Sequence, residues 1–155
     1  MSDVRSMAVI GAGTMGSGIA FTAAAAGLDV HLVDVNPDQL ARAKAYHAKT
    51  FSRNVDKGRM EQADADAAAA RLTYHGELKD ASAAEWVVEA ATENVELKKR
   101  IFGEMLEVFG DSVVLATNTS SISITDIGSV CGDRADRVVG MHFFNPVPVM
   151  KLCEV

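Results

Sequence analysis

The chain has 155 residues, which suffice for one domain that buries roughly 70% of its unfolded surface and are too few for a two-domain enzyme. Hydrophobic residues make up 48% and charged residues 23%, without an apolar run long enough to span a membrane or a signal-peptide pattern, so we expect a soluble, cytoplasmic protein with no membrane contact. A net charge of -6 argues against a nucleic-acid partner, and the two cysteines, Cys131 and Cys153, lack the spacing of a disulfide framework or a zinc site, so no metal is expected.

The chain opens with a strand, a helix and a second strand. Residues 7–11 form a short apolar run ending in glycine, which is typical of a strand buried on both faces. The small, helix-tolerant residues that follow end at Gly27, where a helix C-cap would stand. The apolar run at 29–35 then predicts the second strand. A parallel sheet is the first expectation.

A helical insertion is predicted after the second strand. Asn36 is the expected N-cap, with Pro37 in the first turn, and residues 54–58 break the helix. A shorter, alanine-rich helix runs through Ala70, and extended structure resumes at 72–78. The residues expected on one buried face of the first helix are Leu40, Ala43, His47 and Phe51.

The second half of the chain continues the alternation. Residues 86–91 predict a strand and residues 94–109 a helix that ends at Gly110. The expected apolar stripe of that helix consists of Leu97, Ile101, Phe102, Met105, Leu106 and Phe109. Strands at 112–119, 137–143 and 151–155, with a helix at about 124–131, complete the series. This pattern predicts an α/β fold of the Rossmann type, with a doubly wound, mostly parallel sheet.

The turn from the first strand into the first helix reads GAGTMG, which matches GxGxxG. In this place Gly11 makes a tight turn, Gly13 lets the backbone approach a pyrophosphate, and Gly16 allows close packing of helix on strand. Thr14 and Met15 complete the loop. Free N–H groups at the helix start, together with the helix dipole, supply the anion site. The alternative is a purely structural glycine turn.

Asp34 lies at the end of the second strand, 34 - 11 = 23 residues after Gly11. This separation is near the roughly 20 residues expected of an acidic side chain that binds the ribose of a dinucleotide. Its charge would repel a 2'-phosphate and no arginine directly follows, so NAD is favoured over NADP as the cofactor. A helix-capping aspartate is the alternative.

Two polar clusters follow later strands, where they would meet the nicotinamide. Residues 118–121 read NTSS, and His142 ends the next strand. A histidine there can accept the proton of a substrate hydroxyl, since its ordinary pKa is about 6.5. Glu154 on the last strand could orient it. The residues alone leave open whether His142 is catalytic or a hydrogen-bonded structural histidine.

The motifs at 11–20, 87–99, 118–125 and 142–155 together resemble the L-3-hydroxyacyl-CoA dehydrogenase family, which includes 3-hydroxybutyryl-CoA dehydrogenases. The resemblance covers essentially the whole chain. It implies reversible, NAD-dependent oxidation of an L-3-hydroxyacyl-CoA to the 3-ketoacyl-CoA, in fatty-acid β-oxidation or short-chain acid metabolism. The acyl-CoA is thus the implied partner, and a homo-oligomer is implied for the full-length family.

The resemblance also implies roles for single residues. His142 is the general base, Glu154 orients it, and Ser121 hydrogen-bonds the substrate oxygen and the cofactor. Asn145 lines the nicotinamide pocket. The resemblance places Glu93 and Lys98 beside the cofactor, although both could also be solvated residues at a helix start. The three histidines without an implied role are His31, His47 and His75.

The family continues past the last motif with the rest of the cofactor domain and then a helical domain, which is absent from this chain. We therefore expect residues 1–155 to form a NAD-binding domain that is incomplete at its C-terminal edge. Three alternatives to a dehydrogenase remain open: a non-catalytic NAD-binding module, an inactive truncated fragment, and a structural protein of the same fold.

Overall fold

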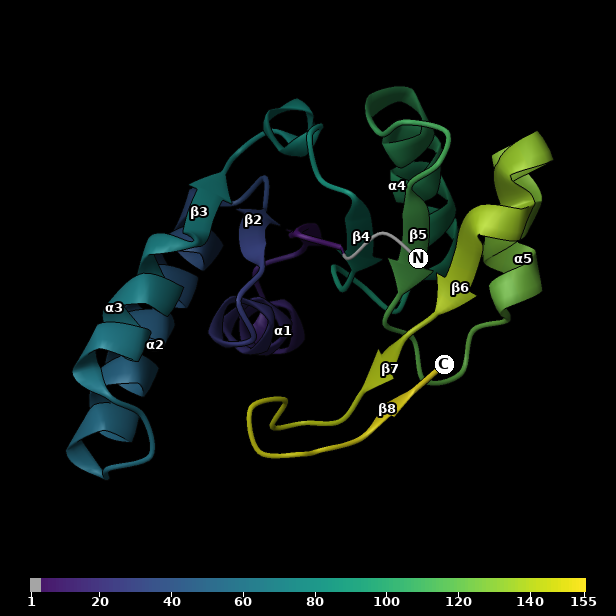
Figure 1. Cartoon of the computed structure of the whole chain (residues 1–155). Coiled ribbons are helices and arrows are strands. Elements are labelled where there is room, and N and C mark those ends of the chain that lie inside the picture. The colour runs from purple at the N-terminus through teal and green to yellow at the C-terminus, as the bar shows by residue number, and fades with distance from the viewer. Residues whose placement is uncertain (1–3) are drawn as a thin grey trace.

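The computed structural model describes residues 4–155 and is built around a six-stranded parallel sheet (Figure 1). The strands are β1 (Ser6–Ile10), β2 (Asp29–Val33), β3 (Leu72–His75), β4 (Trp86–Glu89), β5 (Val114–Thr117) and β6 (Val138–Gly140). Their order in the sheet is β3-β2-β1-β4-β5-β6. The chain winds outward from β1 to one edge, returns to β4, and continues to the other edge. The predicted doubly wound fold is confirmed, and its switch point lies between β1 and β4, where such sheets bind ligands.

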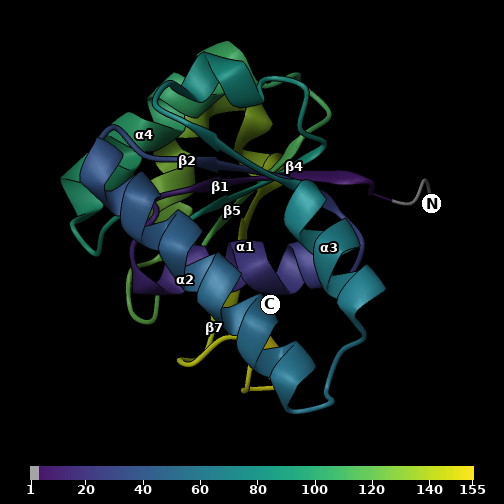
Figure 2. The same cartoon turned by 90° about the vertical axis from the view of Figure 1, so that its left-hand side faces the viewer.

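Helices cover both faces of the sheet (Figures 1 and 2). The α-helices are α1 (Thr14–Ala25), α2 (Pro37–Asp56), α3 (Gln62–Ala70), α4 (Val95–Val108) and α5 (Ile124–Gly128). β1 shows why two layers are needed, because its side chains alternate between two cores: Met7 and Val9 pack with α1 to α3, and Ala8 and Ile10 pack with α4 and α5. In the part of the chain that the structure describes, no helix is long and apolar enough to cross a membrane.

The predicted helical insertion is α2 and α3, which pack against each other and against α1. The Asn36 side chain caps α2 by accepting a hydrogen bond from the Asp38 N–H at 2.9 Å, and Pro37 is the first helical residue. Three of the four residues expected on the buried face are buried, and Leu40 is partly buried. The helix ends at Asp56, two residues before Gly58, whose φ of 62° no longer fits a right-handed helix.

The buried stripe of α4 differs from the prediction by one position. Phe102 and Met105 are buried, but Leu97 is 37% exposed and the neighbouring Lys98 is fully buried. The sequence pattern placed the apolar Leu97 inside because a lysine is seldom buried without a partner. In this structure Lys98 has such a partner in Glu89, which an apolar pattern cannot reveal.

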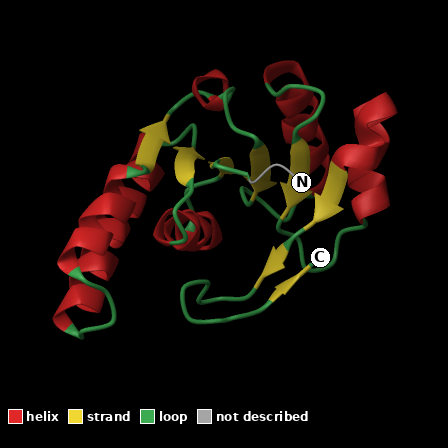
Figure 3. Cartoon of the chain, in the orientation of Figure 1, coloured by secondary structure: helices red, strands yellow, loops and turns green. Residues whose placement is uncertain are grey.

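The C-terminal strands also differ from the prediction. Residues 137–143 do not form one strand: β6 pairs with β5, and β7 (His142–Phe143) then leaves the main sheet to pair antiparallel with β8 (Cys153–Glu154) (Figure 3). Two prolines between β7 and β8 lack the N–H that a sheet ladder needs, so this segment forms a loop. The helix expected at 124–131 is α-helical only to Gly128 and continues as 3-10 helix over Ser129–Arg137, with a kink at Gly132, whose φ is 53°.

Candidate active site

The glycine loop joins β1 to α1 and leaves a space above the helix. Gly11 has a φ of 101°, and a Cβ there would lie 2.6 Å from the Cα of Ala91. A Cβ on Gly16 would overlap the carbonyl oxygen of Gly11, so these two glycines permit close backbone packing. A Cβ on Gly13 would meet no atom within 4 Å. Gly13 therefore faces open space, which a bound ligand can occupy.

The N-terminus of α1 is open to an anion. The N-cap is Gly13, which has no side chain to bond the first-turn amides, and the first N–H groups of a helix have no partner within it. The helix dipole adds a partial positive charge at the same point. Thr14 and Met15 begin this helix and, with Gly13, line the adjoining cavity. The loop thus has the geometry that binds a pyrophosphate.

Asp34 lies directly after β2 and is tied to the glycine loop. Its Oδ2 accepts a hydrogen bond from the Ala12 N–H at 2.8 Å, and its Oδ1 accepts one from the Asn36 N–H at 2.8 Å. The cap of α2 is the side chain of Asn36 and not that of Asp34. Each carboxylate oxygen can accept a further hydrogen bond. Asp34 is therefore held beside the loop as a half-buried acceptor.

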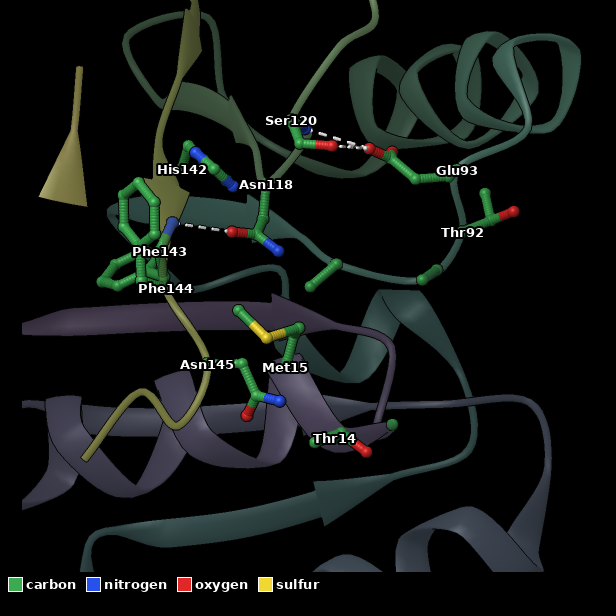
Figure 4. Close-up of a pocket in the computed structure, with 13 residues that line it drawn as sticks. Thr14, Met15, Thr92, Glu93, Asn118, Ser120, His142, Phe143, Phe144 and Asn145 are labelled. Atoms are coloured by element: carbon green, nitrogen blue, oxygen red, sulfur yellow. Dashed lines mark hydrogen bonds between the residues drawn. The ribbon is translucent and has the colours of Figure 1, made fainter. Parts of the chain in front are cut away.

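A cavity of about 440 Å³ lies between the glycine loop and the ends of β4, β5 and β7 (Figure 4). Its wall brings together six of the residues singled out from the sequence: Gly13, Thr14, Met15, Glu93, His142 and Asn145. These residues come from three separate segments, which meet because the carboxyl ends of parallel strands share one edge of the sheet. Ser121, Lys98, Glu154 and Asp34 do not line this cavity.

His142 and Glu154 lie opposite each other in the β7-β8 ribbon. The distance between His142 Nδ1 and Glu154 Oε2 is 3.0 Å, and the two side chains are 24% and 64% exposed. The phenyl ring of Phe144 lies beside the imidazole, with 4.5 Å between ring centroids. With Nδ1 engaged by Glu154, Nε2 is the imidazole nitrogen left for a ligand in the cavity. This arrangement can accept and return a proton.

Comparison with known proteins identifies the family. The family model of the 3-hydroxyacyl-CoA dehydrogenase NAD-binding domain matches residues 6–155. The chain belongs to this family. It is therefore a NAD-binding domain of an oxidoreductase family, as its motifs led us to expect.

Individual relatives agree with the family match. The chain is 44% identical to 3-hydroxyadipyl-CoA dehydrogenase of Escherichia coli, over 100% of this chain and 32% of the relative. It is 40% identical to a probable 3-hydroxybutyryl-CoA dehydrogenase of Bacillus subtilis, over 99% and 53%. The crystal structure of (S)-3-hydroxybutyryl-CoA dehydrogenase from Ralstonia eutropha superposes with a TM-score of 0.93 at 43% identity, over 97% and 53%. The chain thus spans about a third to a half of these relatives.

Glu93, which the resemblance places beside the cofactor, lies at the centre of a hydrogen-bond network. Its Oε1 accepts bonds from the Thr119 hydroxyl at 2.9 Å and from the N–H and hydroxyl of Ser120 at 3.0 and 3.2 Å. Partial burial acts to raise the pKa of Glu93, but the bonds from Ser120 and Thr119 and the charge of Lys98 together lower it. Glu93 is therefore a carboxylate that fixes the turn after β5.

Lys98 lies behind the cavity wall and not in it. Its Nζ is 2.5 Å from Glu89 Oε2, 3.1 Å from Thr117 Oγ1 and 3.6 Å from Glu93 Oε2. Thr117 in turn donates to Glu89 at 2.8 Å, and all three of Lys98, Glu89 and Thr117 are completely buried. Glu89 and Thr117 were not predicted from the sequence. Their only signal was that each polar residue ends an otherwise apolar strand.

The serine in the cavity wall is Ser120, whereas the motif suggested Ser121. Ser121 instead borders a smaller hollow of about 290 Å³, which it shares with His142 and Glu154. Ser120 lines both hollows. The sequence alone could not tell which of the two adjacent serines lines this cavity, because the turn after β5 is irregular.

The other three histidines lie away from the cavity. His47 is buried, and its Nδ1 and Nε2 lie 2.7 Å from the Tyr74 hydroxyl and 2.8 Å from the Ser17 carbonyl oxygen. The Ser17 carbonyl can only accept, so Nε2–H donates to it and Nδ1 of the neutral ring accepts from the Tyr74 hydroxyl. Burial raises the pKa of Tyr74 to about 12. His31 and His75 contact each other at 3.2 Å on neighbouring strands. These three histidines therefore stabilise the fold and do not contribute to the cavity.

Proposed function

We propose that this chain is the cofactor-binding half of a dehydrogenase that oxidises an L-3-hydroxyacyl-CoA to the 3-ketoacyl-CoA. The observation that carries the proposal is that one cavity has the glycine loop on one wall and His142 on the other. A hydroxyl carbon bound there would lie between the cofactor and a proton acceptor. The names of the relatives, which are dehydrogenases of CoA esters, support an acyl-CoA as the substrate.

The residues of the loop fit NAD as the family match requires. The pyrophosphate would occupy the space over Gly13, against the open amides of α1. The adenosine ribose would bond to Asp34, whose charge disfavours a 2'-phosphate. Glu93 and Asn145 would border the nicotinamide half. Bound NAD supplies the hydride acceptor at C4 of the nicotinamide.

The protein's own part in the reaction is proton transfer. The Nε2 atom of neutral His142 would take the proton of the 3-hydroxyl as the C3–H bond breaks. Glu154 would accept the Nδ1–H bond, fix this tautomer and stabilise the imidazolium that forms. In the reverse direction the imidazolium would return the proton to the 3-keto oxygen.

We assign the hydroxyl that contacts the substrate oxygen to Ser120 in place of Ser121. Ser120 lines the cavity beside His142, and Glu93 anchors its N–H. Its hydroxyl donates to Glu93 at 3.2 Å in this structure and would turn its single O–H to the substrate oxygen when substrate binds. Comparing Ser120→Ala with Ser121→Ala tests the assignment. Ser120→Ala should lower kcat/KM by about tenfold or more, as expected for a lost hydrogen bond to a developing charge, and Ser121→Ala by much less.

The proposal is tested by following NADH oxidation with acetoacetyl-CoA, the product expected from 3-hydroxybutyryl-CoA. His142→Ala should reduce turnover by about 100-fold or more, while the matched His75→Asn should leave it unchanged. NADH binding without turnover in the unaltered chain would favour the non-catalytic NAD-binding module instead. That the full-length family forms a homo-oligomer stays a prediction.

A further inference from the structure

Asn118 ties the strand that carries His142 to the centre of the sheet. It follows β5 directly, and its N–H donates to the carbonyl oxygen of Glu89 at 2.8 Å. Its side-chain Oδ1 accepts a hydrogen bond from the Phe143 N–H at 2.9 Å. The β5-β6 pairing ends at Thr117, so the Asn118 side chain takes the place of the next main-chain acceptor.

This bond fixes the orientation of the Asn118 amide. A backbone N–H can only donate, so the atom that faces Phe143 must be the amide oxygen and not the nitrogen. Nδ2 therefore points the opposite way, and Figure 4 shows it turned from Phe143 toward the interior of the cavity that Asn118 lines. Within residues 4–155 no group accepts a hydrogen bond from Nδ2. Two N–H donors thus face the cavity with a direction that rotation of the amide cannot change without breaking the Phe143 bond.

We propose that Asn118 contacts the cofactor directly, with Nδ2 donating to the carboxamide oxygen of the nicotinamide. The donor stands on the β5 side of the cavity, at the same strand end as the anchored Ser120 and across from Met15 of the glycine loop. A neutral donor suits this place because the ring is positively charged in NAD and neutral in NADH. The contact would set the rotation of the ring and hence the face that it turns toward His142.

The inference rests on NAD binding and on the nicotinamide half lying in this cavity. It does not require that His142 act as a base. The contact between Asn118 and the nicotinamide could therefore be absent even if the chain belongs to an active dehydrogenase. It could equally be present in a chain that binds NAD without catalysing a reaction.

Asn118→Asp is the informative substitution. The aspartate has nearly the same shape and keeps an acceptor for the Phe143 N–H, but it replaces the two donors with a carboxylate oxygen. The matched control is Asn94→Asp, because Asn94 also accepts a backbone N–H, from Leu97 at 2.9 Å, and does not line the cavity. Aspartate is an equally good N-cap at that position. Asn118→Ala, which removes both the donor and the acceptor, is the second variant.

The measurement is the dissociation constant of NADH, by fluorescence, and those of NAD and ADP-ribose, by competition. ADP-ribose has the rest of the cofactor but no nicotinamide. Asn118→Asp should raise the NADH Kd by about tenfold, as a carbonyl oxygen loses its donor, and leave that of ADP-ribose within about twofold. NAD should weaken less than NADH, because the new negative charge attracts the oxidised ring. Asn118→Ala should weaken NADH and NAD alike, and Asn94→Asp neither.

Three results would overturn the proposal. Unchanged NADH and NAD affinity in both Asn118 variants would leave Asn118 with a structural role only. Equal losses for NADH and ADP-ribose would point to general damage to the loop. An effect that appears only with acetoacetyl-CoA would move the contact from the cofactor to the substrate carbonyl.

Discussion

The glycine loop and the β7-β8 ribbon form opposite walls of one cavity, but they are held in very different ways. The loop is fixed from within by buried backbone: Gly16 packs behind Gly11, and Asp34 bonds the Ala12 N–H at 2.8 Å. The ribbon consists of two strands of two residues each, and the Glu154 side chain that pairs with His142 is 64% exposed. Changes on the cofactor side should therefore alter folding or NAD affinity, whereas changes in the ribbon should alter proton transfer with little effect on stability.

The largest effect is expected from the buried charges behind the cofactor wall. Lys98→Met leaves the fully buried Glu89 carboxylate without its cation, so the free energy of unfolding should fall by about 3 to 5 kcal/mol. Urea unfolding measures it. The control is Lys99→Met, since the Lys99–Asp126 pair is partly exposed and screened by solvent, so its loss should change the free energy of unfolding far less. Equal losses of unfolding free energy in the two variants would show that the buried ion pair contributes no more to stability than the exposed one.

Two glycines of the loop should differ in their effect on stability, because Gly16 is packed against backbone and Gly13 faces open space. Gly16→Ala forces a Cβ against the carbonyl of Gly11 and should lower the free energy of unfolding by about 1 to 3 kcal/mol or more. Gly13→Ala meets no protein atom and should change it by less than about 1 kcal/mol. Thermal unfolding without cofactor distinguishes them. A Gly13→Ala variant as unstable as Gly16→Ala would contradict the packing described for the loop.

A smaller effect on folding stability is expected from His47, a buried histidine of α2. Burial lowers the pKa of His47 below its ordinary 6.5, although its bond to the Ser17 carbonyl acts in the opposite direction. The unfolded chain then binds a proton first as the pH falls below 6.5, so folding stability is lost below that pH and is regained above it. The slope is at most about 1.4 kcal/mol per pH unit for each histidine.

His47→Gln should remove part of this slope. Burial and the neighbouring His75 also lower the pKa of His31, so a reduced slope remains. Urea unfolding between pH 5 and 8 measures the change. An unaltered slope in His47→Gln would mean that His47 is not held neutral in the fold.

The smallest effect on stability is expected in the ribbon. Glu154→Gln removes a largely exposed ion pair and should cost less than about 1 kcal/mol, while turnover falls because the imidazolium of His142 loses its counter-charge. Parallel unfolding and rate measurements give both numbers. A large loss of stability would show that the ribbon is as firmly held as the loop.

The same contrast explains what the sequence could predict. Strands β1 to β5, α1, α2 and the glycine loop follow from local signals, namely apolar runs, the Asn36 cap and GxGxxG. The buried Lys98 and the choice of Ser120 over Ser121 did not follow, because each depends on residues distant in the chain: Glu89 for the lysine and Glu93 for the serine. The strand expected at 151–155 was overestimated, because only Cys153 and Glu154 pair with β7.

The central claim is that the glycine loop binds the cofactor and the β7-β8 ribbon transfers the proton. Titrating NADH into Gly13→Ala and His142→Ala tests it most directly. A side chain on Gly13 fills the space above α1, so this variant should raise the Kd by about tenfold or more, equivalent to about 1.4 kcal/mol. His142→Ala should bind NADH within about twofold of the unaltered chain. Equal weakening by both substitutions, or none by Gly13→Ala, would contradict the assignment of the loop to the cofactor and of the ribbon to the reaction.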